Sequence, residues 1–226
     1  RGCLWDRFQI AQCYMLFGGI PFYLSLFNVK ESLVQNVDRL CFARGGALRL
    51  EFEELYNALF VHADKYVDIV HLLADRRGGM TSGEIAKITG IDGKRLAKIL
   101  NNLERCDFVM RFKYYGKKNN DIIYKLTDFY TLFYLKYREP NIDFYDEQWW
   151  QHHVASHSVE SWLGLTFELL CLMHIRQIRQ SLGIGGVATE VSTWFDPADK
   201  SKAVKGSQID LIIERADRII HLCEMK

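Results

Sequence analysis

Residues 81–105 contain the sequence TSGEIAKITGIDGKRLAKILNNLER, which predicts two short helices joined by a glycine turn. Thr81 and Glu84 have the spacing of a capping box, and Gly90 ends the helix that they begin. We expect Ile85 and Ile88 to give this helix a buried edge. Asp92 can cap the next helix, which has one apolar stripe and an opposite face that is polar and cationic. Such a pair is typical of the helix-turn-helix, whose second helix reads DNA.

A helix precedes this pair and a hairpin follows it. Apolar residues fill one face of residues 66–74, and residues 76–79 are a helix breaker. Residues 108–115 and 122–126 are two β-prone runs separated by a polar loop, which predicts a hairpin with a cationic tip. Together these elements predict a winged helix-turn-helix.

The charge is unevenly distributed along the chain. Lys and Arg number 29 against 28 Asp and Glu, so the net charge of +1 is uninformative. Residues 76–118, however, hold eleven Lys and Arg against four Asp and Glu. We predict that nucleic acid is contacted by Lys94, Arg95, Lys98, Asn101 and Asn102 of the second helix and by Arg111, Lys113, Lys117 and Lys118 of the hairpin. Winged helices also bind proteins, and a cationic helix face is often merely solvated, so these alternatives stay open.

Composition places the chain among globular proteins. Of its 226 residues, 49% are hydrophobic and 25% are charged, which disfavours disorder and collagen-like repeats. The six cysteines form no Cys-x-x-Cys motif, so we expect neither a disulfide framework nor a zinc ribbon. We therefore expect a cytoplasmic location, where thiols stay reduced. No apolar run approaches the roughly 20 residues that span a bilayer, and no signal peptide begins the chain, so we expect no membrane contact. Because the chain begins at Arg1 and stops within a strand-like run, we interpret it as a piece of a longer protein.

The C-terminal segment contains the candidate chemistry. We expect a helix over residues 160–180 and strands over residues 187–195, 208–214 and 218–226. Glu224 and Lys226 lie two apart on a strand, so they point to the same face and can converge with Asp210 of the neighbouring strand. Asp210 and Glu224 are hard oxygen ligands for Mg²⁺ or Mn²⁺, and Lys226 can orient or deprotonate the attacking water. Glu168 can complete this catalytic set through a ligated water. The alternative is that these groups are strand-end charges that pair with one another.

Three motifs of this segment resemble the PD-(D/E)XK nuclease superfamily: Phe167-Glu168, Gly206-Ser207-Gln208-Ile209-Asp210 and Glu224-Met225-Lys226. More narrowly, the chain resembles the C-terminal half of archaeal-type AAA-like ATPases, whose C-terminal domain is nuclease-like. Residues 18–24, GGIPFYL, are similar to the lid region that follows the ATPase core, and residues 126–130 and 140–141 resemble the helix after the wing. The resemblance implies Asp210, Glu224 and Lys226 as the nuclease-type centre, with Glu168 as a supporting acid.

Two features depart from the family pattern. No Gly-x-x-x-x-Gly-Lys-Ser/Thr motif occurs, so ATP would bind only through an upstream domain of the same polypeptide. The superfamily core also continues beyond the Glu-x-Lys lysine, on which this chain ends. We therefore predict a mixed α and α+β fold with four parts: a helical lid-like remnant (1–56), a winged helix-turn-helix (57–138), a linker (139–149) and an incomplete PD-(D/E)XK nuclease-like α/β domain (150–226).

The expected function is that of the C-terminal part of an ATPase, which binds DNA through the winged helix and carries a Mg²⁺- or Mn²⁺-dependent, phosphodiester-hydrolysing centre. The alternative is a non-catalytic regulatory or protein-interaction module that couples an upstream ATPase to DNA or to a partner protein. The sequence does not determine the oligomeric state.

Overall fold

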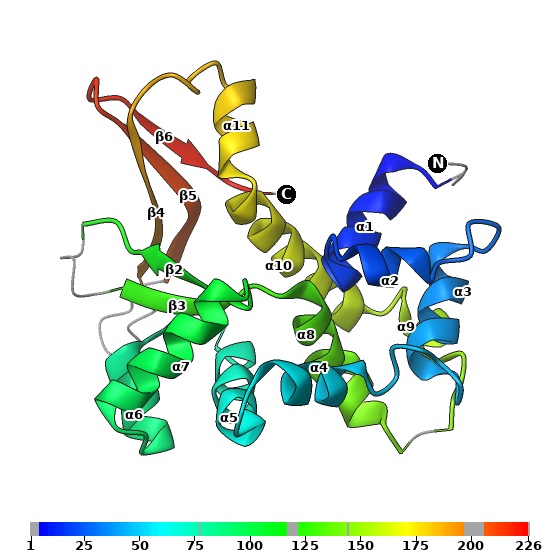
Figure 1. Cartoon of the computed structure of the whole chain (residues 1–226). Coiled ribbons are helices and arrows are strands. Elements are labelled where there is room, and N and C mark those ends of the chain that lie inside the picture. The colour runs from blue at the N-terminus through cyan, green and yellow to red at the C-terminus, as the bar shows by residue number, and fades with distance from the viewer. Residues whose placement is uncertain (1–4, 77, 117–121, 144, 197–205, 226) are drawn as a thin grey trace. The chain divides into compact units, whose positions relative to one another are not determined.

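The structure is a computed structural model that describes residues 5–76, 78–116, 122–143, 145–196 and 206–225. The chain divides into two compact units (Figure 1). The first unit contains residues 1–74 and 127–166, and the second contains residues 75–126 and 167–226. The fold is mixed α and β, with two three-stranded sheets among the described residues. The finer domain boundaries expected from the sequence stay a prediction.

The first unit is helical. In chain order it contains α1 (Arg7–Phe17), α2 (Pro21–Ser25), α3 (Leu33–Val37), α4 (Glu51–Leu59), α5 (Ala63–Ala74), α8 (Phe129–Phe133), α9 (Trp149–His153) and the first part of α10 (His157–Met173). A π-helical turn over Asp38–Phe42 continues α3, and another over Tyr134–Arg138 continues α8 before the 3₁₀ turn Glu139–Asn141.

Aromatic side chains fill the core of this unit. Phe133 is fully buried, and its ring centroid lies 5.3 Å from that of Trp150 and 5.8 Å from that of Phe17. The buried Tyr130 hydroxyl donates a hydrogen bond of 2.7 Å to the Leu48 carbonyl oxygen. Because this hydroxyl has an acceptor, burying the ring leaves no hydrogen-bond donor unsatisfied. The aromatic recurrence over residues 129–137 therefore serves core packing.

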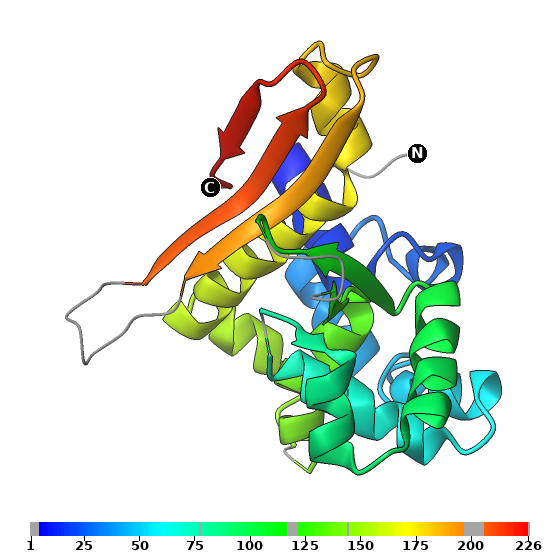
Figure 2. The same cartoon turned by 90° about the vertical axis from the view of Figure 1, so that its left-hand side faces the viewer.

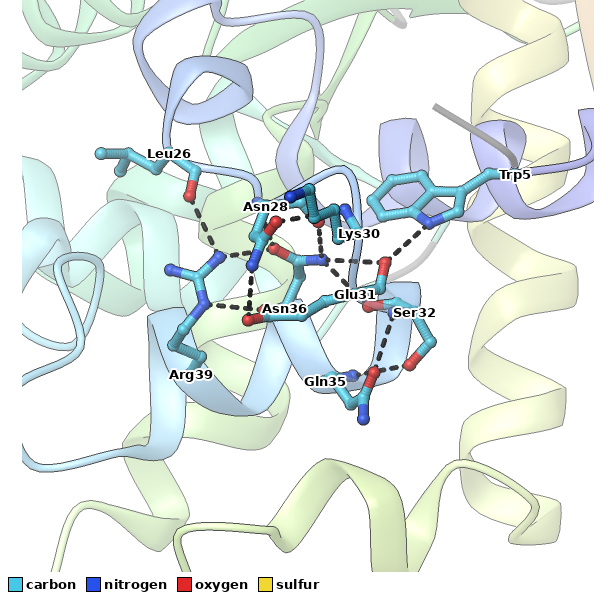
Figure 3. Close-up of polar contacts among 9 residues, drawn as sticks. All are labelled: Trp5, Leu26, Asn28, Lys30, Glu31, Ser32, Gln35, Asn36 and Arg39. Atoms are coloured by element: carbon cyan, nitrogen blue, oxygen red, sulfur yellow. Dashed lines mark hydrogen bonds and ion pairs between the residues drawn. The ribbon is translucent and has the colours of Figure 1, made fainter. Parts of the chain in front are cut away.

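A polar network fixes the loop between α2 and α3 (Figure 3). Asn36 is fully buried, and its Nδ2 donates to the carbonyl oxygens of Asn28 and Ser32, each at 3.0 Å. Its Oδ1 accepts from the Asn28 N–H at 2.8 Å and also from Arg39. Arg39 in turn pairs with Glu31 at 2.9 Å. The side chains thus add to the hydrogen bonds that the loop forms within its own backbone.

The second unit begins with β1 (Met80–Thr81), α6 (Ser82–Thr89) and α7 (Gly93–Arg105). The predicted capping box at the start of α6 is confirmed, as is the left-handed Gly90 at its end. The Asp92 carboxylate accepts hydrogen bonds from the first turn of α7, and the apolar stripe of α7 is buried, as predicted. The predicted burial of Ile88 is wrong, since it is 55% exposed. Among the residues of α6 only Ile85 is buried, so this short helix is anchored at one position.

A hairpin of β2 (Val109–Lys113) and β3 (Ile122–Leu126) follows, as predicted. Its antiparallel register pairs Val109 with Leu126 and Lys113 with Ile122. The unpredicted strand β1 pairs with β3, which gives the sheet order β1-β3-β2. Two residues are too few to show the period-two pattern by which strands are recognised. The hairpin tip, residues 117–121, lies outside the described residues, and with it the predicted contacts of Lys117 and Lys118.

The rest of the second unit contains the end of α10, α11 (Ile175–Ser181), β4 (Thr189–Asp196), β5 (Ser207–Arg215) and β6 (Ile220–Cys223). The prediction of one continuous helix over residues 160–180 is wrong, because His174 has non-helical backbone angles and separates α10 from α11. The three predicted strands form an antiparallel sheet in the order β4-β5-β6 (Figure 2). Its core consists of Leu172, Ile184, Leu211 and Ile213.

Candidate acidic site

A β-bulge lies at Asp210. Ile212 pairs with Ser192 and Ile209 pairs with Trp194, so the two residues between them on β5 face only Thr193 on β4. An arrangement in which two residues of one strand face a single residue of the other defines a β-bulge, which kinks the strand and redirects a side chain. Strict alternation along β5 therefore does not determine where the Asp210 side chain points.

Two hydrogen bonds hold the half-buried Asp210 carboxylate. Its Oδ1 accepts from Gln208 Nε2 at 2.9 Å, and its Oδ2 accepts from the Met225 backbone N–H at 2.9 Å. The second bond attaches the segment after β6 to β5. A charge-assisted bond of this kind is stronger than one between neutral groups.

Glu224 lies one residue beyond β6 and is exposed. The pairing of β5 with β6 ends at Leu211 and Cys223, so Asp210 and Glu224 both lie just beyond it. The hydrogen bond from the Met225 N–H to Asp210 brings the segment that contains Glu224 close to Asp210. Lys226 lies outside the described residues, and its role stays a prediction.

Glu168 and Asp210 act on the same two groups. Burial lowers the pKa of the Lys125 ammonium, and the charges of Glu168 and Asp210 oppose this effect. Burial also raises the pKa of the Cys171 thiol, which Asp210 and Glu168 raise further. The charges of Glu168 on α10 and Asp210 on β5 therefore both influence the protonation of Lys125 and of Cys171.

Sequence reasoning did not connect Lys125 and Cys171 with these two carboxylates. Lys125 belongs to the hairpin, 43 positions before Glu168, and nothing in a single sequence brings the two together. The available signal was a lysine placed within an otherwise apolar strand, Ile122–Leu126. Cys171 lies one helical turn after Glu168, which is a spacing that puts two side chains on one helix face.

The donor chemistry at this site suits a hard divalent cation that keeps water ligands. Among the described residues, no group of three or more His, Cys, Asp or Glu could hold a metal ion. Mg²⁺, however, usually retains several waters and takes only one or two carboxylates together with substrate phosphates. A metal ion held by Asp210 and Glu224, with Glu168 as a supporting acid, therefore stays a prediction.

The cationic residues predicted on α7 lie largely at the surface. Lys94, Arg95, Lys98 and Asn101 are exposed, whereas Asn102 is half-buried. On the hairpin, Lys113 is exposed, while Arg111 forms an ion pair of 2.6 Å with Glu104. Such surface pairs contribute about 0–1 kcal/mol, so an anion can displace Glu104 at small cost.

Comparisons with known proteins give one distant similarity. The chain is 23% identical over 211 residues to the uncharacterized protein MJECL04 of Methanocaldococcus jannaschii. The alignment covers 92% of this chain and 45% of that protein, so the chain spans about half the length of the relative. No family model matches the chain, and no solved structure matches it. In the described part of the chain, none of the helices has the length and apolar character needed to cross a bilayer.

Proposed function

We propose that this chain is the DNA-binding part of a larger protein, in which a winged helix-turn-helix presents α7 and the β2–β3 hairpin to a duplex. The observation that supports this proposal is the two-sided character of α7. Leu96, Ile99, Leu100 and Leu103 are buried along one side of α7, while Lys94, Arg95 and Lys98 are exposed on the other. A helix of this kind can enter a major groove.

The position of these charges along α7 also favours groove binding. Lys94 and Arg95 are the second and third residues of the helix, which begins at Gly93. In a helix-turn-helix, the N-terminal residues of the second helix contact the base edges. Lys98 and Asn101 follow at one and two turns, and Lys113 lies on the neighbouring hairpin. The resemblance to archaeal-type AAA-like ATPases supports an upstream ATPase domain of the same polypeptide as the partner.

The salt dependence of DNA affinity tests this proposal. Anisotropy of a labelled duplex should show strong, salt-sensitive binding by the wild-type protein. The triple change Lys94→Ala, Arg95→Ala and Lys98→Ala should reduce the slope of log K against log salt by about 3, since each phosphate contact contributes about 0.9. The matched control replaces three exposed cations elsewhere, Lys87, Lys136 and Arg176, with alanine. Equal slopes for the two triple variants would contradict binding through α7.

A second candidate function is metal-dependent phosphodiester hydrolysis at the acidic site. The supporting observations are that the Met225 N–H bonds the segment containing Glu224 to Asp210, and that the charges of Asp210 and Glu168 act on the same two groups. Asp210 and Glu224 would hold a divalent cation, with Glu168 as a supporting acid. A bound Mg²⁺ or Mn²⁺ polarises the phosphoryl group and lowers the pKa of a ligated water. The Asp210 carboxylate is oriented for this role by Gln208 and the Met225 N–H.

Nicking of supercoiled plasmid in Mg²⁺ or Mn²⁺ tests the second function. The full-length parent protein should nick the plasmid, and Asp210→Ala and Lys226→Ala should each abolish nicking. Asp217→Ala is the control, because Asp217 lies in the β5–β6 turn and pairs with Arg215. Equal nicking by all four proteins would contradict the catalytic assignment. DNA binding without any cleavage would favour the non-catalytic alternative, in which the chain couples an ATPase to DNA.

A further inference from the structure

Arg138 is a buried arginine whose guanidinium group is only partly hydrogen-bonded. It is the last residue of the π-helical turn Tyr134–Arg138 and is 1% exposed. Its Nη1 donates to the Asn141 carbonyl oxygen at 2.8 Å, whereas Nε and Nη2 are buried without a hydrogen-bond partner in the described part of the chain. Nε and Nη2 form the edge of a guanidinium with which arginine donates two parallel hydrogen bonds to a carboxylate or phosphate. A whole binding edge of Arg138 is therefore unused.

A second arginine donates to the same turn of the first unit. The half-buried Arg49 donates from Nη2 to the Ile142 carbonyl oxygen at 3.3 Å, and its Nε is buried without a hydrogen-bond partner among the described residues. Asn141 and Ile142 are consecutive, so the guanidinium groups of Arg138 and Arg49 bind neighbouring carbonyl oxygens. The two arginines thus bring three buried N–H-bearing atoms without an acceptor to one end of this turn.

An aromatic ring and a carbonyl oxygen hold the Arg138 guanidinium in place. Its Cζ lies 6.0 Å from the centroid of the Phe42 ring, at the limit of a cation–π contact. Phe42 is the last residue of the π-helical turn Asp38–Phe42, so this contact joins two π-helical turns. Such turns are rare and frequently occur at functional sites. Because packing already orients Arg138, a ligand would bind it with little loss of side-chain freedom.

The acidic side chains next to these arginines in the sequence have other partners. Glu139 pairs with His71 at 3.2 Å, and Asp38 accepts hydrogen bonds from backbone N–H groups at the start of α9. Among the residues that the structure describes, neither Arg49 nor Arg138 forms an ion pair. Burial, and then the like charge of Arg49, lower the pKa of the Arg138 guanidinium. A buried charge is costly unless it is paired, so a negatively charged ligand would stabilise this arrangement.

We propose that Arg138 and Arg49 bind a small oxyanion of the phosphate class, to which Arg138 donates from Nε and Nη2 and Arg49 supplies the second positive charge. Two cations match the charge of about −1.5 to −2 on a phosphate group better than the single charge of a carboxylate. The donor atoms are buried, which favours a small ion over a nucleic-acid backbone, and the half-buried Arg49 is the side from which an ion reaches them. This site belongs to the first unit, whereas the residues of both proposed functions belong to the second.

Isothermal titration calorimetry with inorganic phosphate, at constant ionic strength, tests the site. The wild-type protein should bind one phosphate per chain and bind acetate more weakly. Arg138→Lys keeps the charge but loses the two-donor edge, so its affinity should fall at least about ten-fold. Arg49→Met should weaken binding at least about five-fold. Lys136→Met is the matched control, because Lys136 is exposed in the same π-helical turn, and it should bind like the wild-type protein. Tighter binding of glycerol phosphate than of inorganic phosphate would support the site and identify an organic phosphate as its source. No binding by the wild-type protein, or equal affinity in Arg138→Lys, would overturn the inference.

Thermal unfolding gives a second, independent measurement. A ligand that binds only the folded state raises the unfolding temperature, so low-millimolar phosphate should raise that of the wild-type protein and of Lys136→Met. It should raise that of Arg138→Lys and Arg49→Met much less. Phosphate at high concentration stabilises most proteins by exclusion from their surface, which is why the concentration is kept low and the variants are compared. Equal increases in the wild-type protein and Arg138→Lys would overturn the inference. Both arginine variants retain most of the buried side chain, and Arg49 is only half-buried, so the comparison does not depend on one substitution.

Discussion

Asp210 and Met225 are joined by a hydrogen bond of 2.9 Å from the Met225 backbone N–H to the Asp210 Oδ2 atom. β6 ends at Cys223, so Met225 has left the strand ladder and takes its hydrogen bond from a side chain. The same carboxylate is the one that acts on Lys125 and Cys171. A single acidic residue therefore connects the chain segment after β6 with the acidic site.

Removing this carboxylate should release the segment after β6. In Asp210→Ala, the Met225 amide loses its acceptor, so its hydrogen exchange should accelerate at least about ten-fold, corresponding to the loss of a charge-assisted hydrogen bond of about 1.5–3 kcal/mol. Asp210→Asn retains an acceptor oxygen and should give an intermediate rate. Asp217→Ala should leave the Met225 rate unchanged. Unchanged exchange at Met225 in Asp210→Ala would show that this hydrogen bond does not protect the segment.

Leu211 and Leu222 of the second sheet should differ in their contribution to stability. Leu211 is fully buried in its core, whereas Leu222, on the neighbouring strand, is 64% exposed. Leu211→Ala should destabilise the unit by about 2–5 kcal/mol, since it removes buried methyl groups and leaves a cavity. Leu222→Ala should change the stability by less than about 0.5 kcal/mol. Urea unfolding followed by circular dichroism measures both, and comparable losses would contradict the register of β5 and β6.

The α2–α3 loop should depend on Asn36. Asn36→Ala leaves the Asn28 N–H without its acceptor and removes one of the two donors to the carbonyl oxygens of Asn28 and Ser32, so a loss of about 1–3 kcal/mol is expected. Asn57→Ala is the matched control, because Asn57 is exposed on α4. Thermal unfolding of the two variants checks the difference. An Asn36→Ala protein as stable as Asn57→Ala would mean that the network does not stabilise the loop.

The α6 capping box should contribute a pH-dependent stability. The Thr81 backbone N–H, and then its hydroxyl, donate to the Glu84 carboxylate and lower its pKa below the usual value. A carboxyl whose pKa is lower in the folded state stabilises the fold above its unfolded pKa of about 4.3, and this contribution disappears as the pH falls through the folded value.

Replacing Glu84 should therefore alter the pH profile. Glu84→Gln keeps a capping side chain but cannot titrate, so the wild-type protein should lose more stability than this variant between about pH 5 and pH 3. Thr81→Ala should cost about 1 kcal/mol at neutral pH, because α6 loses its N-cap. Urea unfolding at several pH values measures both effects. Parallel profiles for the wild-type protein and Glu84→Gln would contradict the pKa shift at Glu84.

The local elements of the second unit were largely predictable because their signals lie close together in the sequence. Thr81, Glu84 and Gly90 act within one or two helical turns, and they mark the ends of α6 as they do in the structure. The break at His174 was not predictable, because Ile175 and Ile178 continue the helical spacing of the apolar residues before it. Strand β1 was also not predicted from the sequence, because its two residues become a strand only by pairing with β3.

The sequence by itself determined the ends of α6, the start of α7, the β2–β3 hairpin, the buried stripe of α7 and the last three strands, because hydrogen bonding and burial of those elements follow short-range periodicity. It also identified Asp210, Glu224 and Glu168 as candidates. The tertiary structure alone decided that a bulge lies at Asp210 and that the charges of Glu168 and Asp210 act on Lys125. The physical reason is that a bulge is a mismatch between two strands, and the electric field at Lys125 arises from residues 43 and 85 positions away. Neither property belongs to any one segment of the chain.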